Sequence, residues 1–270
     1  MEVDLLGHPY EQRTLHLGRD EEGPVVATLV RRPAGTATRR AVLWIHGWSD
    51  YFFQTHVGDW FAARGFTFYA LDLRKYGRSL RPYQTPNFCH SLAEYLPELD
   101  EAARIIRSED GHDRLLVVAH STGALTSALW VHRHAARRAG AGPVDAMILN
   151  SPFFDLGLAQ PLRRPAGHLV DRVGRRHPYR ILPRPRSAVY GHSLHVDFGG
   201  EWAYDLSWKP VGGFPVRFGW LAAVRAGHRR LHAGLAIDVP VLVACATRSY
   251  RGRRWRERAG YATRCSMWMR

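Results

Sequence analysis

The sequence predicts an α/β fold in which a mostly parallel sheet carries helices on both of its faces. Over the first 150 residues, strand-like apolar runs alternate with helix-like stretches, which is the pattern of such folds. The runs Ala41–Ile45 and Phe66–Leu71 are continuously apolar, as expected of strands buried on both sides. A chain of 270 residues that is 46% hydrophobic is large enough to form one domain around a core.

The remaining elements follow from local periodicity and from turn residues. Two early strands, Glu11–Leu17 and Pro24–Arg31, are separated by the turn-like Asp20–Gly23. Further strands, each expected to be buried, are Leu115–Val118, Ala146–Leu149 and Val239–Ala244. Helix-like periodicity marks the segments Gln54–Arg64, Ser91–Arg107 and Thr122–Ala136.

The alternation stops after Pro152, which divides the chain into four predicted parts. Residues 1–152 form the first part of the core, and residues 238–249 return to it with one more strand. Between them, residues 153–237 are rich in Arg, Pro, His and aromatic residues and contain no clear strand. An irregular insertion after the sixth predicted strand is typical of a cap or lid. Residues 250–270 form a basic tail.

Ser121 is the candidate nucleophile. It lies in Ala119-His120-Ser121-Thr122-Gly123, between a predicted strand and a predicted helix. Small residues at both ends of this motif permit a tight strand-to-helix turn that lifts the serine hydroxyl above the sheet edge. The alternative is a serine that caps the helix.

Two other loops follow predicted strands. In His46-Gly47-Trp48 the backbone N–H of Trp48, together with that of Thr122, is expected to form an oxyanion hole. The alternative is a loop histidine beside a glycine at a helix entry. Asp72 and Arg74 open the segment that ends at Ser79, and we expect its Asp and Arg residues to brace the loop behind the active site.

Together these segments resemble the monoacylglycerol lipase-like or lysophospholipase-like enzymes of the α/β-hydrolase superfamily, also called serine aminopeptidases of the S33 type. The resemblance covers roughly residues 20 to 248, and Ala119 stands where most members have Gly. It implies that the insertion is a cap that shapes an acyl-binding pocket. The residues expected at this pocket are His46, Gly47, His120, Trp202, Trp208, Phe214 and Trp220. The aromatic residues equally fit a small core within the cap.

The resemblance also implies an acid and then a histidine that complete a catalytic triad after the strand at Val239–Ala244. The sequence contains neither an aspartate nor a histidine after Ser249, and Asp155 is the candidate substitute acid. We therefore expect the last strand and helix of the fold to be missing and the activity to be low or nil. One explanation is a frameshift, because one back-translation of Ala262–Arg270 encodes aspartates when it is read two bases later.

Several other functions are disfavoured. The net charge of +14 comes almost wholly from arginine, is scattered apart from the tail, and accompanies no nucleic-acid-binding motif. The four histidines His192, His195, His228 and His232 fit no metal-ligand spacing, so neither a metal nor a cofactor is expected. Cys89, Cys245 and Cys265 are expected to be unpaired thiols. No apolar run suits a membrane helix or a signal peptide, so a cytoplasmic protein is expected.

The leading prediction is a serine hydrolase that cleaves carboxylic esters, such as acyl glycerols or lysophospholipids, through an acyl-enzyme on Ser121. Two alternatives stay open. One is a serine aminopeptidase, because the fold does not choose between ester and amide bonds. The other is a catalytically inactive binding protein whose pocket still accepts acyl ligands. The sequence leaves the exact substrate and the oligomeric state open.

Overall fold

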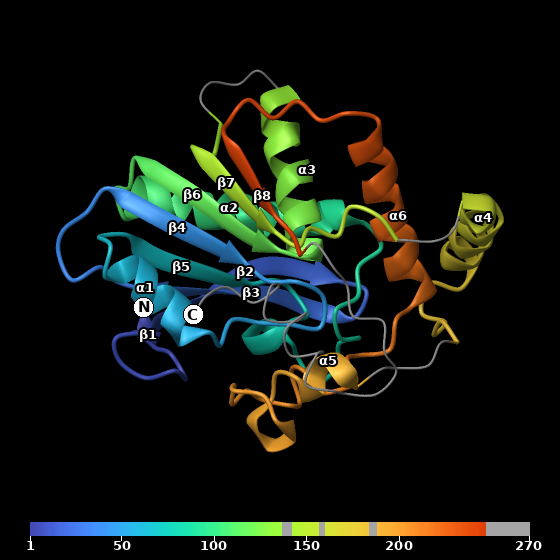
Figure 1. The fold of residues 1–270 in the computed structure, drawn as a ribbon, viewed down its shortest axis with the longest axis horizontal. Coiled ribbons are helices and arrows are strands. Elements are labelled where there is room, and N and C mark those ends of the chain that lie inside the picture. Colours follow the sequence, from blue (N-terminus) through green and yellow to red (C-terminus); the bar gives the residue numbers. More distant parts are fainter. Residues whose placement is uncertain (137–141, 157–159, 184–187, 247–270) are drawn as a thin grey trace.

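The computed structural model of the chain describes residues 1–136, 142–156, 160–183 and 188–246. They contain an eight-stranded sheet with the strand order β1-β2-β3-β5-β4-β6-β7-β8 (Figure 1). Its strands are β1 (Glu2–Val3), β2 (Glu11–Asp20), β3 (Gly23–Arg32), β4 (Arg40–Ile45), β5 (Thr67–Asp72), β6 (Arg114–His120), β7 (Ala146–Asn150) and β8 (Val241–Ala244).

The sheet is parallel where the candidate site lies. Strands β4 and β5, β4 and β6, β6 and β7, and β7 and β8 pair in parallel, whereas β1, β2 and β3 add an antiparallel edge through the β3–β5 pair. The mostly parallel sheet of the sequence prediction is confirmed. The short strand β1 was not predicted, so the insertion follows the seventh strand of the chain rather than the sixth.

Six α-helices connect these strands in the described residues. They are α1 (Thr55–Ala62), α2 (Leu96–Arg104), α3 (Thr122–Ala136), α4 (Gln160–Arg176), α5 (Val189–His192) and α6 (Phe218–His232). Helix α3 has the predicted bounds. The predicted helix Ser91–Arg107 is instead three pieces, because a capping box at Ser91 and Glu94 starts a short 3₁₀ turn, η2 (Leu92–Tyr95), before α2, and a π turn, η3 (Ile105–Glu109), ends it.

The helices cover both faces of the sheet, as predicted (Figure 1). Alternate residues of one strand point to opposite faces, so Leu43 belongs to one buried cluster while Val42 and Trp44 belong to another. The first cluster includes side chains of α2, α3 and α6, and the second includes Val57 and Phe61 of α1. Two buried clusters on opposite faces hold the central strands in place.

The described part of the segment between β7 and β8 contains the helices α4, α5 and α6, with irregular stretches between them. Helices α4 and α6 lie side by side at one end of the molecule, and α6 also packs against α3 (Figure 1). Apart from the isolated bridges Ile181–Arg217 and His195–Trp202, this segment forms no strand in its described residues. None of the helices in the described ranges is long and apolar enough to span a bilayer.

The prediction that β8 is buried is wrong. Val241, Leu242 and Val243 are 40, 57 and 50% exposed. The reason is that, within the described residues, β8 pairs with β7 on one side only, whereas each inner strand pairs on both. The basic tail, and with it the expectation of a missing strand and helix, falls on residues 247–270, which lie outside the described residues.

Candidate active site

Ser121 lies at a sharp turn between a strand and a helix. Strand β6 ends at His120 and helix α3 begins at Thr122, which leaves Ser121 alone at the turn with a φ of +54°. A left-handed backbone at a non-glycine residue costs about 1–3 kcal/mol and collects at functional sites. The backbone of Ser121 is held from both sides, since its N–H donates to Asn150 O at 3.1 Å and its carbonyl accepts from Phe153 N at 3.0 Å.

The small residues around Ser121 have a visible steric reason. A Cβ atom at Gly123 would lie 2.2 Å from the carbonyl oxygen of His46 and 2.9 Å from that of Ile45. Ala119 is completely buried at the other end of the motif. Helix α3 therefore starts in direct contact with the end of strand β4, and only a residue without a side chain fits at the third position of the turn.

The loop after β4 lies directly against the serine. A Cβ atom at Gly47 would lie 3.0 Å from Ser121 Cβ, so the backbone of this loop passes very close to the candidate nucleophile. The next residue, Trp48, lines a cavity together with Ser121 and Thr122. The structure thus brings together the three residues from which the sequence predicted a nucleophile and two oxyanion donors.

This cavity, hereafter the Ser121 cavity, has a volume of about 520 Å³. Ligand pockets for small molecules span roughly 300–1,000 Å³. Ser121 and Thr122 are its polar uncharged lining residues, and Arg225 of α6 is the charged residue among the described residues that line it. Most of the wall is apolar, including Trp48, Phe153, Leu182, Val216, Trp220 and Leu221. The cavity has the composition of a site for a mainly apolar ligand.

The predicted pocket residues divide into two groups. Trp220 lines the Ser121 cavity, with its ring 5.2 Å from that of Trp48. The prediction that Trp202 and Trp208 line the pocket is corrected, because both pack against a separate buried cluster with Tyr51 and Tyr204. Trp208 meets the ring of Tyr51 edge to face at 5.3 Å. These two tryptophans therefore pack at a buried cluster that the insertion shares with the loop before α1, through Tyr51 and Phe53.

His46 and Phe214 also lie outside the set that lines the Ser121 cavity. The His46 side chain is buried and structural, with Nε2 accepting from Leu73 N at 3.0 Å. The backbone N–H of Phe214 donates to Ser49 Oγ at 3.2 Å, next to the loop that carries Trp48. Both residues therefore support the shape of the site rather than the wall of the cavity.

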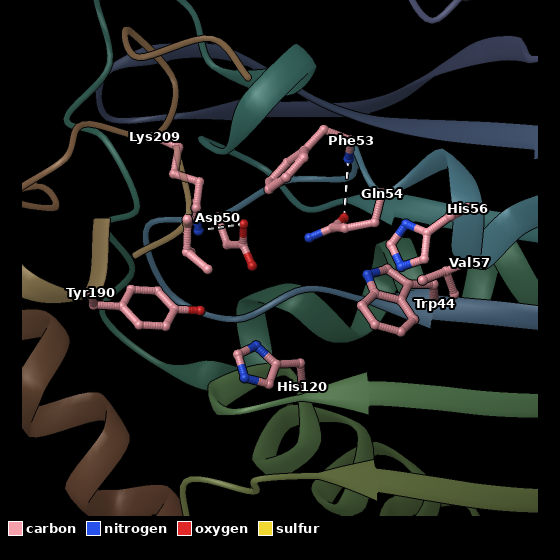
Figure 2. A pocket seen from close by; sticks show the side chains of 10 residues that line it. Trp44, Asp50, Phe53, Gln54, His56, Val57, His120, Tyr190 and Lys209 are labelled. Carbon is pink, nitrogen blue, oxygen red and sulfur yellow. Dashed lines mark hydrogen bonds and ion pairs between the residues drawn. The ribbon is translucent and has the colours of Figure 1, made fainter. Parts of the chain in front are cut away.

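His120 points into a different cavity from Ser121. Figure 2 shows its ring facing a small cavity whose wall also carries Asp50 and Lys209, which form an ion pair at 2.7 Å. The volume of about 20 Å³ has room for about one water molecule. Trp44 Nε1 lines the same cavity and has no hydrogen-bond partner within the described residues. His120 is thus turned away from the candidate nucleophile.

We expect the neutral form of His120 to contribute to the pH dependence of stability. Burial lowers the pKa of His120 to about 4, against the partial opposition of Asp50, whereas an unfolded chain titrates near 6.5. Between these values the unfolded chain binds a proton that the folded chain rejects, so the free energy of unfolding falls as the pH falls, by up to about 1.4 kcal/mol per pH unit.

Urea denaturation of the wild type and of His120→Gln at several pH values checks this expectation. The variant should lose less stability between pH 6.5 and 4, and His16→Gln, which replaces an exposed histidine, should behave as the wild type. Parallel curves for the wild type and His120→Gln would contradict it.

The segment after β5 makes the bracing contacts expected of it. Asp72 is fully buried, and its carboxylate accepts from the backbone N–H groups of Phe52 at 2.9 Å and Arg78 at 3.1 Å. Arg78 completes the network by donating to Asp72, to Phe52 O and to Asp4. Arg74 instead pairs with Glu98 at 2.6 Å. The loops behind the Ser121 turn are therefore tied to one another by buried charges.

The described histidines and acids near the turn have other partners. His228 Nε2 lies 2.7 Å from Phe153 O, and burial lowers the pKa of His228 while nearby Asp155 opposes the shift. Asp155 is exposed and accepts from Leu156 N at 2.7 Å. Among residues 1–136, 142–156, 160–183 and 188–246, no side chain forms a hydrogen bond with Ser121 Oγ.

The other ligand-type side chains are dispersed. His232 contacts Phe154 O at 3.0 Å, and His195 contacts Tyr204 O at 3.2 Å. No group of three or more His, Cys, Asp or Glu residues in the described ranges could hold a metal ion. Cys89 and Cys245 are free thiols, and Cys265 lies outside the described residues.

Two features of the site were not foreseen from the sequence. One is the Asp50–Lys209 ion pair, whose partners are 159 residues apart, and no local pattern could have paired them. The other is Arg225, which lines the Ser121 cavity from α6. No sequence signal pointed to Arg225, because neither helix α6 nor Leu221 as a cavity residue was predicted; in the structure Arg225 follows Leu221 by four positions, on the same face of α6.

Comparison with known sequences agrees with this geometry. The sequence model of the family described as serine aminopeptidase, S33, matches residues 36–247. The protein of Escherichia coli (strain K12) named uncharacterized protein YnbC is 34% identical over 120 residues, which are 44% of this chain and 19% of that protein. The chain therefore aligns with only about a fifth of the length of that relative.

Comparison with solved structures supports the fold. A soluble variant of monoglyceride lipase from Saccharomyces cerevisiae, in complex with a substrate analog, superposes with a TM-score of 0.63 at 16% identity, over 86% of this chain and 75% of that one. Monoacylglycerol lipase from Paleococcus ferrophilus superposes with a TM-score of 0.57 at 19% identity, over 80% and 76%. The chain therefore belongs to the serine aminopeptidase S33 family of α/β-hydrolases, and its fold is that of the monoglyceride lipases.

Proposed function

We propose that the chain is a serine hydrolase that cleaves carboxylic esters of apolar acyl groups, such as acyl glycerols or lysophospholipids. The observation that carries the proposal is Ser121 itself, which stands at a φ of +54° in the wall of an apolar cavity beside Trp48 and Thr122. A strained nucleophile next to two candidate N–H donors is the arrangement that acyl transfer requires.

In the proposed reaction Ser121 Oγ attacks the ester carbonyl carbon and loses its proton to a base. The N–H groups of Trp48 and Thr122 stabilise the negative charge on the carbonyl oxygen. The bond to the alkoxy oxygen then breaks, the alcohol leaves with the proton, and water hydrolyses the acyl-enzyme to a carboxylic acid and free Ser121. The identity of the base is the open step, since the described residues offer no histidine hydrogen-bonded to Ser121 Oγ.

The lining of the Ser121 cavity favours an ester over a peptide. An aminopeptidase must bind the positively charged α-ammonium group of its substrate, which calls for a carboxylate. The charged residue among the described lining residues is Arg225, whose positive charge repels an ammonium group. The apolar wall suits an acyl chain.

A fluorophosphonate probe tests the proposal, because it labels a serine that is activated for attack rather than one that binds a particular substrate. Intact mass spectrometry should show one adduct on the wild type and none on Ser121→Ala. A set of p-nitrophenyl esters and amino-acid p-nitroanilides would then separate ester from amide cleavage, and we expect turnover of the esters only.

The second candidate is an acyl-binding protein without catalytic activity. It is favoured by the absence, among the described residues, of a side chain that hydrogen-bonds to Ser121 Oγ, together with a cavity of about 520 Å³. A folded protein that the probe fails to label, but that binds acyl ligands, would replace the hydrolase proposal with this one.

A further inference from the structure

The Ser121 cavity contains a charged side chain in an otherwise mainly apolar wall. Arg225 comes from α6, the helix that also supplies Trp220 and Leu221 to the wall. The Arg225 side chain is only 18% exposed. A cation in such surroundings is costly unless an anion compensates for it, so its partners decide what the site can bind.

The compensation for Arg225 is incomplete. Its Nε lies 3.1 Å from Asp171 Oδ1 of α4, and its Nη2 lies 3.5 Å from Asp171 Oδ2. Asp171 Oδ2 also accepts from Arg229 Nη1 at 2.9 Å. One carboxylate therefore faces two guanidinium groups, which leaves this cluster with an excess positive charge. Within the described ranges, Arg225 donates from Nε and Nη2 but not from Nη1, so the N–H groups of Nη1 are available to a ligand.

Helix α4 leaves space for the guanidinium at the cavity. A Cβ atom at Gly167 would lie 2.0 Å from Arg225 Nη2, 2.5 Å from Cζ and 2.7 Å from Nη1. Gly167 itself lines the Ser121 cavity. The lack of a side chain at Gly167 thus lets the planar group of Arg225 lie against the backbone of α4, where it borders the cavity.

We propose that Arg225 recognises an anionic group on the substrate, so that the preferred ligand is an acyl ester whose chain also carries a carboxylate or a phosphate. A guanidinium binds either group through charge-assisted hydrogen bonds in a planar geometry. The apolar wall takes the hydrocarbon part of the chain, and Arg225 takes the anion. This inference rests on the proposed function for the position of the ester at Ser121.

Binding of matched ligands tests the proposal without any bond cleavage. Isothermal titration calorimetry on the Ser121→Ala protein would compare the monomethyl ester of octanedioic acid, an anion at neutral pH, with neutral methyl octanoate. This comparison is the carboxylate arm of the experiment, and a comparison of octyl phosphate with octanol is the phosphate arm. In at least one arm we expect the anion to bind about 10-fold more tightly than its neutral partner, which is typical of a hydrogen bond to a charged group. The arm with the larger preference identifies the anion.

Variants of α6 assign this preference to Arg225. Arg225→Met should reduce it to about 1-fold, because Arg225 is the cation among the described residues that line the cavity. Arg230→Met is the matched control, since it removes a cation of the same helix that contacts His132 and does not line the Ser121 cavity, and the preference should persist. If Arg225→Met does not fold, Arg225→Lys tests the same assignment. A lysine cannot form two parallel hydrogen bonds to one anion as a planar guanidinium does, so it should lower the preference by at least about 3-fold.

Equal affinities for charged and neutral ligands in both arms would overturn the proposal, as would a preference that survives the changes at Arg225. The outcome is separate from that of the hydrolase proposal. If the protein shows the Arg225-dependent preference but is not labelled at Ser121, the role of Arg225 stands and the hydrolase proposal is contradicted. If Ser121 is labelled but the preference is absent, the hydrolase proposal stands and the role of Arg225 is contradicted.

Discussion

Replacing Arg78 with methionine is expected to lower the free energy of unfolding by about 3–5 kcal/mol, the range found when one partner of a buried ion pair is removed. The guanidinium of Arg78 contacts Asp4 at 2.6 Å and Asp72 at 2.9 Å, and both carboxylates are fully buried. Without Arg78, two buried negative charges lose their main compensation, while the methionine restores only the packing of the stem.

Equilibrium unfolding in urea measures this effect, with Arg39→Met as the matched control. Arg39 forms an ion pair with Asp113 at 2.6 Å, but its side chain is 74% exposed, and pairs of this kind contribute about 0–1 kcal/mol. Similar losses for Arg78→Met and Arg39→Met would mean that the buried network is not what holds the loops behind Ser121.

Replacing Gly123 with alanine is expected to disrupt the turn that carries Ser121. The new Cβ atom would lie 2.2 Å from His46 O, so α3 must move away from the end of β4. Overpacking of this kind costs about 1–3 kcal/mol. The movement also separates Thr122 from Trp48, so labelling of Ser121 by the fluorophosphonate probe should slow by about 10-fold or more, which corresponds to a loss of at least about 1.4 kcal/mol of stabilisation.

Gly35→Ala is the control for this experiment, because an added Cβ at Gly35 meets no atom within 4 Å. Its labelling rate and unfolding curve should match those of the wild type. If Gly123→Ala were labelled as fast as the wild type, the close contact between helix and strand would not be needed for the reactivity of Ser121.

The central sheet could be predicted because its signal is local. Parallel strands buried on both faces are continuous apolar runs, and the elbow at Ser121 is recognisable from a strand, a serine between small residues and a helix. Helix α3 was predicted with its observed bounds because Thr122–Ala136 begins directly after the turn and keeps helical periodicity to its end.

The cap could be predicted less well, for physical reasons. The buried residues of helix α6 have a helical spacing. They include Trp220, Leu221, Val224 and His228. Arginine and histidine residues between them make this apolar face hard to recognise in the sequence. The aromatic character of Trp202 and Trp208 also does not predict where they pack, because the wall of a ligand pocket and a small hydrophobic cluster contain the same residue types. The exposure of β8 could not be predicted from its own apolar residues, because it depends on whether another strand pairs with the second side of β8.

The ion pair between Asp50 and Lys209 has a thermodynamic consequence. Together with the contact from Phe214 N to Ser49 Oγ, it joins residues 209–214 of the insertion to the loop that carries Trp48. Elements joined by shared contacts do not respond independently, and any free energy that couples them acts equally in both directions. A change in the conformation of residues 209–214 is therefore expected to shift the loop that carries Trp48, and a shift of that loop is expected to move residues 209–214 by the same coupling.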